Sequence, residues 1–168
     1  MIQILNRKWS FLSVFLLFFL FSCDDSIEFI KYESISGANW ETKNNVAFDF
    51  SVQDTITPKN LFIYVRNTSD YPFSNIYVIT TLVLPDETRI IDILQYEMAD
   101  TSGKFLGKGF TDTKENKLYY KEKKRFPRKG NYQFQIRQAM RKNGEVSPLI
   151  VLKGIQDIGF SIEKATKK

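Results

Sequence analysis

Residues 46–53 read Val-Ala-Phe-Asp-Phe-Ser-Val-Gln, and this stretch decides the fold class. Val46, Phe48, Phe50 and Val52 stand at every second position, with small or polar residues between them. Because successive side chains of a β-strand point to opposite faces, this alternation places the four apolar side chains on one face. The stretch therefore predicts a strand with one face in a core and the other in solvent.

Seven further segments on either side are rich in strand-forming residues and are separated by turn signals containing Pro, Gly, Asn or Asp. These segments are 29–35, 61–66, 75–84, 89–96, 117–125, 132–138 and 155–163. About eight short, regularly spaced strands predict an all-β fold, an antiparallel β-sandwich for which a jelly roll is one possible topology. Residues 28–168 are too few for two cores, so we expect a single domain.

Three local features add detail to this prediction. The pair Pro85-Asp86 suits the centre of a tight turn, so residues 76–84 and 89–96 are expected to form a hairpin. The segment 61–66 is apolar on both faces and is expected to lie centrally in a sheet or under a loop. Residues 136–141 predict a strand that runs into a short helical turn.

The N-terminus has the features of a secretory signal. Two basic residues precede a run at 11–21 that is apolar except for one serine and is too short to span a bilayer. Its ending, Leu20-Phe21-Ser22-Cys23, resembles the bacterial lipobox. The resemblance implies cleavage after Ser22, a diacylglycerol on the Cys23 sulfur and an acyl chain such as palmitate on the new amino group. The alternative is an ordinary signal peptide followed by a free cysteine.

The lipobox divides the chain into a signal peptide at 1–22, a lipidated tether at 23–27 and the domain that follows. The five residues from Cys23 to Glu28 reach about 17 Å at most when extended, so the domain would sit against its membrane. Two anchoring signals already give stable attachment, and three acyl chains exceed them. We therefore expect the lipid bilayer to be a partner through acylated Cys23.

The composition excludes several classes of chemistry. The chain has no His and one Cys, which excludes a Ser-His-Asp or Cys-His nucleophile and a Cys/His zinc site. We expect no enzyme activity, no cofactor and no metal. The net charge is +5, and because Arg7 and Lys8 precede Cys23 while no acid does, the mature chain carries +3. Without a motif, this charge is too small to predict nucleic-acid binding.

One long segment, 97–116, lacks strand alternation and holds three of the eight glycines. Loops of this length in compact domains are usually functional or disordered, and the apolar residues within it favour packing over disorder. We expect a partner contact here, with Asp100, Lys104, Phe105 and Phe110 as candidate residues.

Four acids lie in or near this segment: Asp92, Glu97, Asp100 and Asp112. A pair of them could serve glycoside hydrolysis if the two carboxyl groups flanked a sugar bond. The favoured interpretation is solvated surface acids. The segment lacks the calcium-loop pattern of alternating acids, so no metal is assigned.

A second candidate contact is the basic stretch 121–129, which holds six basic residues against one acid and includes a predicted turn. It could bind anionic lipid headgroups or an acidic partner. The alternative is a solvated hairpin whose lysines prevent edge-to-edge pairing. The candidate residues are Lys123, Lys124, Arg125, Arg128 and Lys129.

Aromatic residues raise a different possibility. Trp40, Tyr71, Phe73 and Tyr77 could form a platform that stacks a sugar ring, although such residues more often pack in the core. Tyr132 follows Gly-Asn and opens a strand, which resembles a tyrosine corner, a structural feature.

The order of these segments resembles the gliding-motility lipoprotein H (GldH) family of the Bacteroidota. The resemblance covers nearly the whole chain and rests on Cys23 followed by 62–67, 71–75, 92–100, 103–109, 130–134, 138–141 and 152–159. It implies an envelope lipoprotein that works with other motility lipoproteins in machinery linked to type IX secretion. It supplies no catalytic residues.

These observations together predict a non-catalytic scaffold or stabiliser of the gliding machinery, anchored at Cys23 to the periplasmic face of the outer membrane. Its expected partners are other gliding-motility lipoproteins and envelope proteins. The alternative function is a surface carbohydrate-binding module of a nutrient-uptake system, which the predicted sandwich and its aromatic residues suggest.

Overall fold

The computed structural model describes residues 26–109 and 112–165. The predicted signal peptide 1–22, the cleavage after Ser22, the lipidated Cys23 and the candidate contact Phe110 lie outside the described residues. The elements are β1 (Ile27–Ser34), η2 (Ser36–Ala38), β2 (Asn39–Glu41), β3 (Val46–Val52), β4 (Lys59–Asn67), β5 (Asn75–Val83), β6 (Arg89–Glu97), β7 (Lys114–Lys124), β8 (Gly130–Gln138), β9 (Val151–Lys153) and β10 (Ile155–Lys164).

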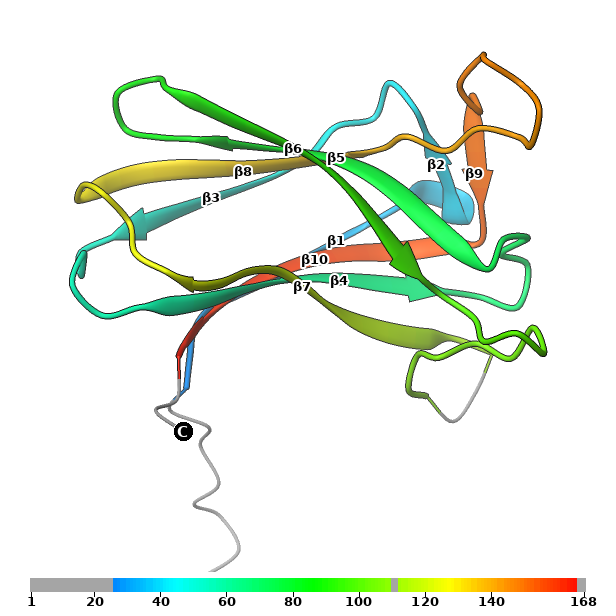
Figure 1. The fold of residues 1–168 in the computed structure, drawn as a ribbon, viewed down its shortest axis with the longest axis horizontal. Coiled ribbons are helices and arrows are strands. Elements are labelled where there is room, and N and C mark those ends of the chain that lie inside the picture. Colours follow the sequence, from blue (N-terminus) through cyan, green and yellow to red (C-terminus); the bar gives the residue numbers. More distant parts are fainter. Residues whose placement is uncertain (1–25, 110–111, 166–168) are drawn as a thin grey trace, which may run out of the picture.

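Two four-stranded antiparallel sheets face each other, which confirms the predicted all-β sandwich. One sheet has the order β1-β10-β4-β7 and the other β3-β8-β5-β6, and these are the lower and upper layers in Figure 1. The strands pair as a nested ladder: β1 with β10, β2 with β9, β3 with β8, β4 with β7 and β5 with β6. A long hairpin rolled up in this way is a jelly roll.

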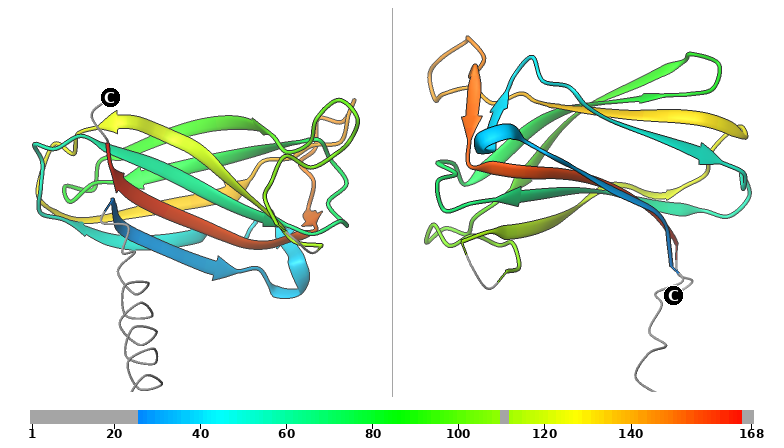
Figure 2. Two further views of the ribbon diagram at one scale, coloured as in Figure 1. Left: turned by 90° about the horizontal axis from the view of Figure 1, so that it is seen from below. Right: turned by 180° about the vertical axis from the view of Figure 1, so that it is seen from behind.

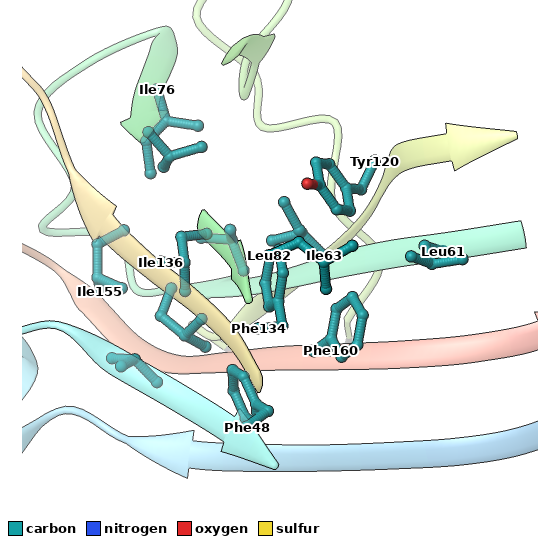
Figure 3. Packing of buried hydrophobic residues seen from close by; sticks show 14 of the residues in the cluster. Phe48, Leu61, Ile63, Ile76, Leu82, Tyr120, Phe134, Ile136, Ile155 and Phe160 are labelled. Carbon is teal, nitrogen blue, oxygen red and sulfur yellow. The ribbon is translucent and has the colours of Figure 1, made fainter. Parts of the chain in front are cut away.

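The stretch that predicted the fold forms β3, and its burial alternates along the strand as expected. Phe48 points between the sheets and packs against Phe160 of β10 (Figure 3). Phe50 is also buried and packs against Phe160. Phe134 of β8 stacks on Phe160 with ring centroids 4.1 Å apart, so these rings join the two sheets at the centre of the core. The apolar face of β3 thus contributes to the core that holds the two sheets together.

The strand predicted to be central, β4, lies between β10 and β7, and residues 61–65 are all buried. Its outer face is covered by side chains of the neighbouring strands. Phe62 contacts Tyr119 with ring centroids 4.4 Å apart, and the Lys117 ammonium lies 4.2 Å from the Phe62 ring centroid. The apolar pattern on both faces therefore indicated a central position correctly.

The predicted hairpin is also confirmed, since β5 and β6 pair from Asn75 with Glu97 to Val83 with Arg89. The short helical turn expected at 136–141 is wrong. After Gln138 the chain stays extended, because the buried Gln138 amide donates to the Leu149 carbonyl at 2.7 Å and its oxygen accepts from the Met140 amide at 2.8 Å.

The tyrosine corner is confirmed. The ring of Tyr132 is buried, and its hydroxyl donates to the Arg128 carbonyl four residues upstream, at 2.8 Å. This bond holds the turn between β7 and β8 against the core.

The two ends of the sandwich differ in what they carry. At one end, here called the tether end, β1 begins and β10 finishes, and the loops 53–58, 84–88 and 125–129 lie beside them (Figures 1 and 2). The Lys164 amide donates to the Ser26 carbonyl at 2.8 Å, which joins the first and last described strands. The opposite end carries the loops 68–74, 98–113 and 139–150.

Candidate interaction surfaces

The basic stretch lies at the tether end, where β7 turns into β8. The Lys123 amide donates to the Asn60 side-chain oxygen at 2.9 Å, and Arg125 Nε donates to the Ile56 carbonyl at 3.1 Å. Arg128 forms an ion pair with Asp86 in the neighbouring hairpin. These contacts hold the turn in one shape, so the backbone positions that carry the basic side chains are defined.

A buried lysine, which the sequence did not single out, lies beneath this surface. Lys59 is 3% exposed, and its ammonium contacts the carboxylates of Glu28 at 2.5 Å and Asp54 at 3.1 Å. Burial lowers the pKa of Lys59, but hydrogen bonds and charge from these two acids outweigh burial and raise the pKa above its ordinary value. Lys59 therefore stays charged and ties β1, β4 and the 53–58 loop together.

The long loop at the opposite end is built around Asp100. Its carboxylate accepts hydrogen bonds from the amides of Ser102 at 2.9 Å and Lys104 at 3.0 Å. Phe105 is partly buried and packs on Tyr71, with ring centroids 6.4 Å apart, whereas Lys104 is exposed. The expectation that apolar residues pack this loop onto the domain is confirmed for Phe105.

The structure does not bring the two predicted contact surfaces together. The loop 98–113 precedes β7 and the basic turn 125–129 follows it. The eleven residues of β7 span about 33 Å at 3.3 Å per residue, which separates the surfaces by the length of the sandwich. The two candidate surfaces therefore do not form one continuous contact patch for a partner.

Of the acids considered for glycoside hydrolysis, Asp92 lies on β6 and is engaged in local contacts. Asp92 accepts hydrogen bonds from Tyr120 and Lys121, both at 3.0 Å. Burial, followed by the Asp92 charge, raises the pKa of Tyr96 to about 12. Glu97 and Asp112 are exposed. Among residues 26–109 and 112–165, no group of three or more His, Cys, Asp or Glu side chains is arranged to hold a metal ion.

The aromatic platform does not form. Trp40 and Tyr71 are buried in the core, and Phe73 lies against Tyr71 in a partly buried position. Tyr77 alone of the four is exposed. Three of the four side chains therefore pack the domain, as the core interpretation expected, and the aromatic platform no longer supports a carbohydrate-binding module.

Sequence reasoning missed one exposed apolar side chain at the tether end. Ile56 is 81% exposed at the tip of the 53–58 loop, where Asp54 accepts hydrogen bonds from the amides of Ile56 at 2.9 Å and Thr57 at 3.1 Å. The available signal was an isoleucine inside a turn of otherwise polar residues.

Acid should destabilise the domain at three turns in which an aspartate carboxylate accepts hydrogen bonds from residues that follow it. The side chains and amides of Thr57, Thr88 and Ser102 hydrogen-bond Asp54, Asp86 and Asp100 respectively, and lower the pKa of each carboxyl below its ordinary 3.8. Because the folded state then binds protons less readily than the unfolded state, this stability is present above about pH 4 and is lost as the pH falls further.

We therefore expect the thermal unfolding temperature to decrease as the pH is lowered from about 4 to about 2. Circular dichroism melts across this range measure it. Asp100→Asn, which keeps an acceptor oxygen but cannot titrate, should give a shallower fall than the unsubstituted chain. A midpoint independent of pH in this range would contradict the assignment.

In the part of the chain that the structure describes, no helix is both long and apolar enough to cross a membrane.

Comparisons of the sequence with known proteins agree on one family. A family model described as GldH lipoprotein matches residues 28–162. The gliding motility lipoprotein GldH of Flavobacterium johnsoniae is 42% identical over 145 residues, 86% of this chain and 89% of the relative. A GldH homolog of Christiangramia forsetii is 41% identical over 155 residues, 92% of this chain and 94% of the relative. Among solved structures, the VP2 subviral particle of infectious bursal disease virus has a TM-score of 0.32 at 14% identity, covering 84% of this chain and 34% of that one, which supports no functional statement.

Proposed function

Because this chain belongs to the GldH lipoprotein family, we propose that it is an envelope lipoprotein that serves gliding motility as a non-catalytic scaffold or stabiliser of the motility machinery. The observation that carries the proposal is the family match across residues 28–162. Two relatives that bear the family name align with this chain over most of their length. The machinery it would serve is linked to type IX secretion.

The proposed anchor is Cys23, cleaved from the signal peptide after Ser22 and acylated with a diacylglycerol and a fatty acid such as palmitate. Cys23 lies three residues before Ser26, the first described residue, and three residues reach about 11 Å at most. The acyl chains would therefore hold the tether end close to the bilayer. The proposed location is the periplasmic face of the outer membrane.

The proposed partner contact is at the opposite end, the length of β7 away from the tether end. Lys104 is exposed there on a loop whose shape Asp100 and Phe105 maintain. Such a loop can bind another envelope protein with little loss of conformational entropy. The expected partners are other gliding-motility lipoproteins, with no cofactor involved.

The test is single-cell gliding speed on glass in a deletion strain of the native host, provided that host glides. We expect movement to be lost, and to be restored by the wild-type gene but not by a Cys23→Ala gene. The Cys23→Ala protein should be absent from the membrane fraction. Asp25→Ala keeps the cysteine and serves as the matched control, with movement and membrane attachment restored.

Two results would oppose the proposal. Normal gliding of the deletion strain would remove the motility role. Membrane retention of Cys23→Ala would remove the anchor while leaving the family assignment unchanged.

A further inference from the structure

Ser26, where the described domain begins, lies beside the loop that carries Ile56. The Lys164 amide donates to the Ser26 carbonyl at 2.8 Å, and the Ala165 amide donates to the Pro58 carbonyl at 3.1 Å. Ser26 and the 53–58 loop are thus both held by the end of β10. Whatever surface holds Cys23 will also lie near this loop.

The basic residues of β7 and its turn lie at the same level of the sandwich. Lys164 of β10 pairs with Lys59 of β4, and Lys59 pairs with Lys124 of β7. Neighbouring strands are about 4.8 Å apart, so Lys124 is about 15 Å across the sheet from Ser26. Ser26 and the basic turn are therefore close enough to each other for one flat surface to face both.

Several acids also lie at the tether end, but most are paired there. Glu28 and Asp54 bind the buried Lys59, and Asp86 binds Arg128. The exposed Glu122 lies 4.0 Å from the Lys123 ammonium. By contrast, three basic side chains of this end form no ion pair with any residue that the structure describes: Lys124, Arg125 and Lys129.

The exposed Ile56 completes this surface. Asp54 fixes its loop from inside, and Arg125 Nε donates to the Ile56 carbonyl, so the isoleucine side chain is held outward next to a guanidinium. An isolated exposed isoleucine is ordinary on a protein surface. An apolar tip flanked by unpaired basic groups, beside the chain that leads to a lipid anchor, matches the chemistry of a membrane interface.

We propose that the tether end docks flat onto anionic phospholipid headgroups, with Ile56 entering the interface and Lys124, Arg125 and Lys129 contacting phosphates. This inference rests on the proposed anchor at Cys23. It adds an orientation, because an acyl tether alone lets the domain rotate, whereas a docked end directs the 98–113 loop away from the bilayer.

The experiment uses the mature lipoprotein carrying Ile56→Cys, labelled with an environment-sensitive fluorophore and reconstituted into vesicles. The diacylglycerol blocks the Cys23 sulfur, so the introduced thiol is the one that reacts. Ile150→Cys at the opposite end, where Ile150 is 77% exposed, is the matched control. The vesicles are phosphatidylcholine alone or an equal mixture with phosphatidylglycerol.

We expect the label at position 56 to shift to the blue and brighten severalfold on the mixed vesicles, and the label at position 150 to stay unchanged. Adding Lys124→Glu and Lys129→Glu, or raising the salt concentration, should reverse most of the shift. Labels that behave alike at both positions, while the protein floats with the vesicles, would overturn the docking and leave the anchor intact. A protein that fails to float with either type of vesicle would overturn both.

Discussion

Phe134→Ala should lower the free energy of unfolding by about 4 kcal/mol, within the range of about 3 to 5 kcal/mol seen when a buried aromatic ring is truncated. Phe134 is fully buried on β8 and stacks on Phe160 of β10, so its ring contacts the opposite sheet. It also lies against Phe48 and Tyr120. The rings around it belong to β3, β7 and β10, which have limited freedom to collapse into the space.

Urea unfolding of the mature chain, followed by tryptophan fluorescence, measures this loss. Ile91→Ala is the matched control, because Ile91 lies on β6 of the same sheet but is 63% exposed, and it should change stability by less than about 0.5 kcal/mol. Equal effects of the two substitutions would contradict the placement of the core between the sheets.

Gly154→Ala should destabilise the domain by about 4 kcal/mol, which is large for the loss of a glycine. Gly154 lies between β9 and β10 with φ of 78°, a left-handed conformation that favours glycine. Its amide donates to the Ala38 carbonyl and its carbonyl accepts from the Thr68 amide, both at 2.8 Å. An added Cβ would lie 2.7 Å from the Tyr71 Cα, inside the backbone of the 68–74 loop.

Gly144→Ala separates the cost of the dihedral angle from the cost of the clash. Gly144 has φ of 82°, but a Cβ there meets nothing within 4 Å. We expect a loss of about 1 kcal/mol for Gly144→Ala, from backbone strain alone. The two substitutions are compared by thermal and urea unfolding, and similar losses for both would show that the loop does not approach Gly154 as closely as described.

The alternation at 46–53 predicted β3 because a half-buried strand needs a period of two, whatever its partner. For the same local reason, the turn chemistry of Pro85-Asp86 predicted the β5–β6 hairpin. The strands β2 and β9 have three residues each, which is too few for a pattern to show. They form because pairing of β1 with β10 and of β3 with β8 brings their backbones together.

The candidate surfaces, too, were predictable from the sequence only where they depend on local properties. Charge counting identified the basic residues at 121–129, and the lack of strand alternation identified the segment 97–116, because both properties are local. That Lys59 would be buried depends on which segments cover it. Neither the spacing nor the composition of the sequence contains that information.

The sequence by itself determined the all-β class, the β5–β6 hairpin and the residues available for chemistry, since each depends on neighbours along the chain. The tertiary structure alone decided that the start of β1, the Ile56 loop and the basic turn share one end, while the 98–113 loop lies at the other. The physical reason is the nested antiparallel pairing, which brings residues more than a hundred positions apart, such as Ser26 and Lys164, into hydrogen-bond contact.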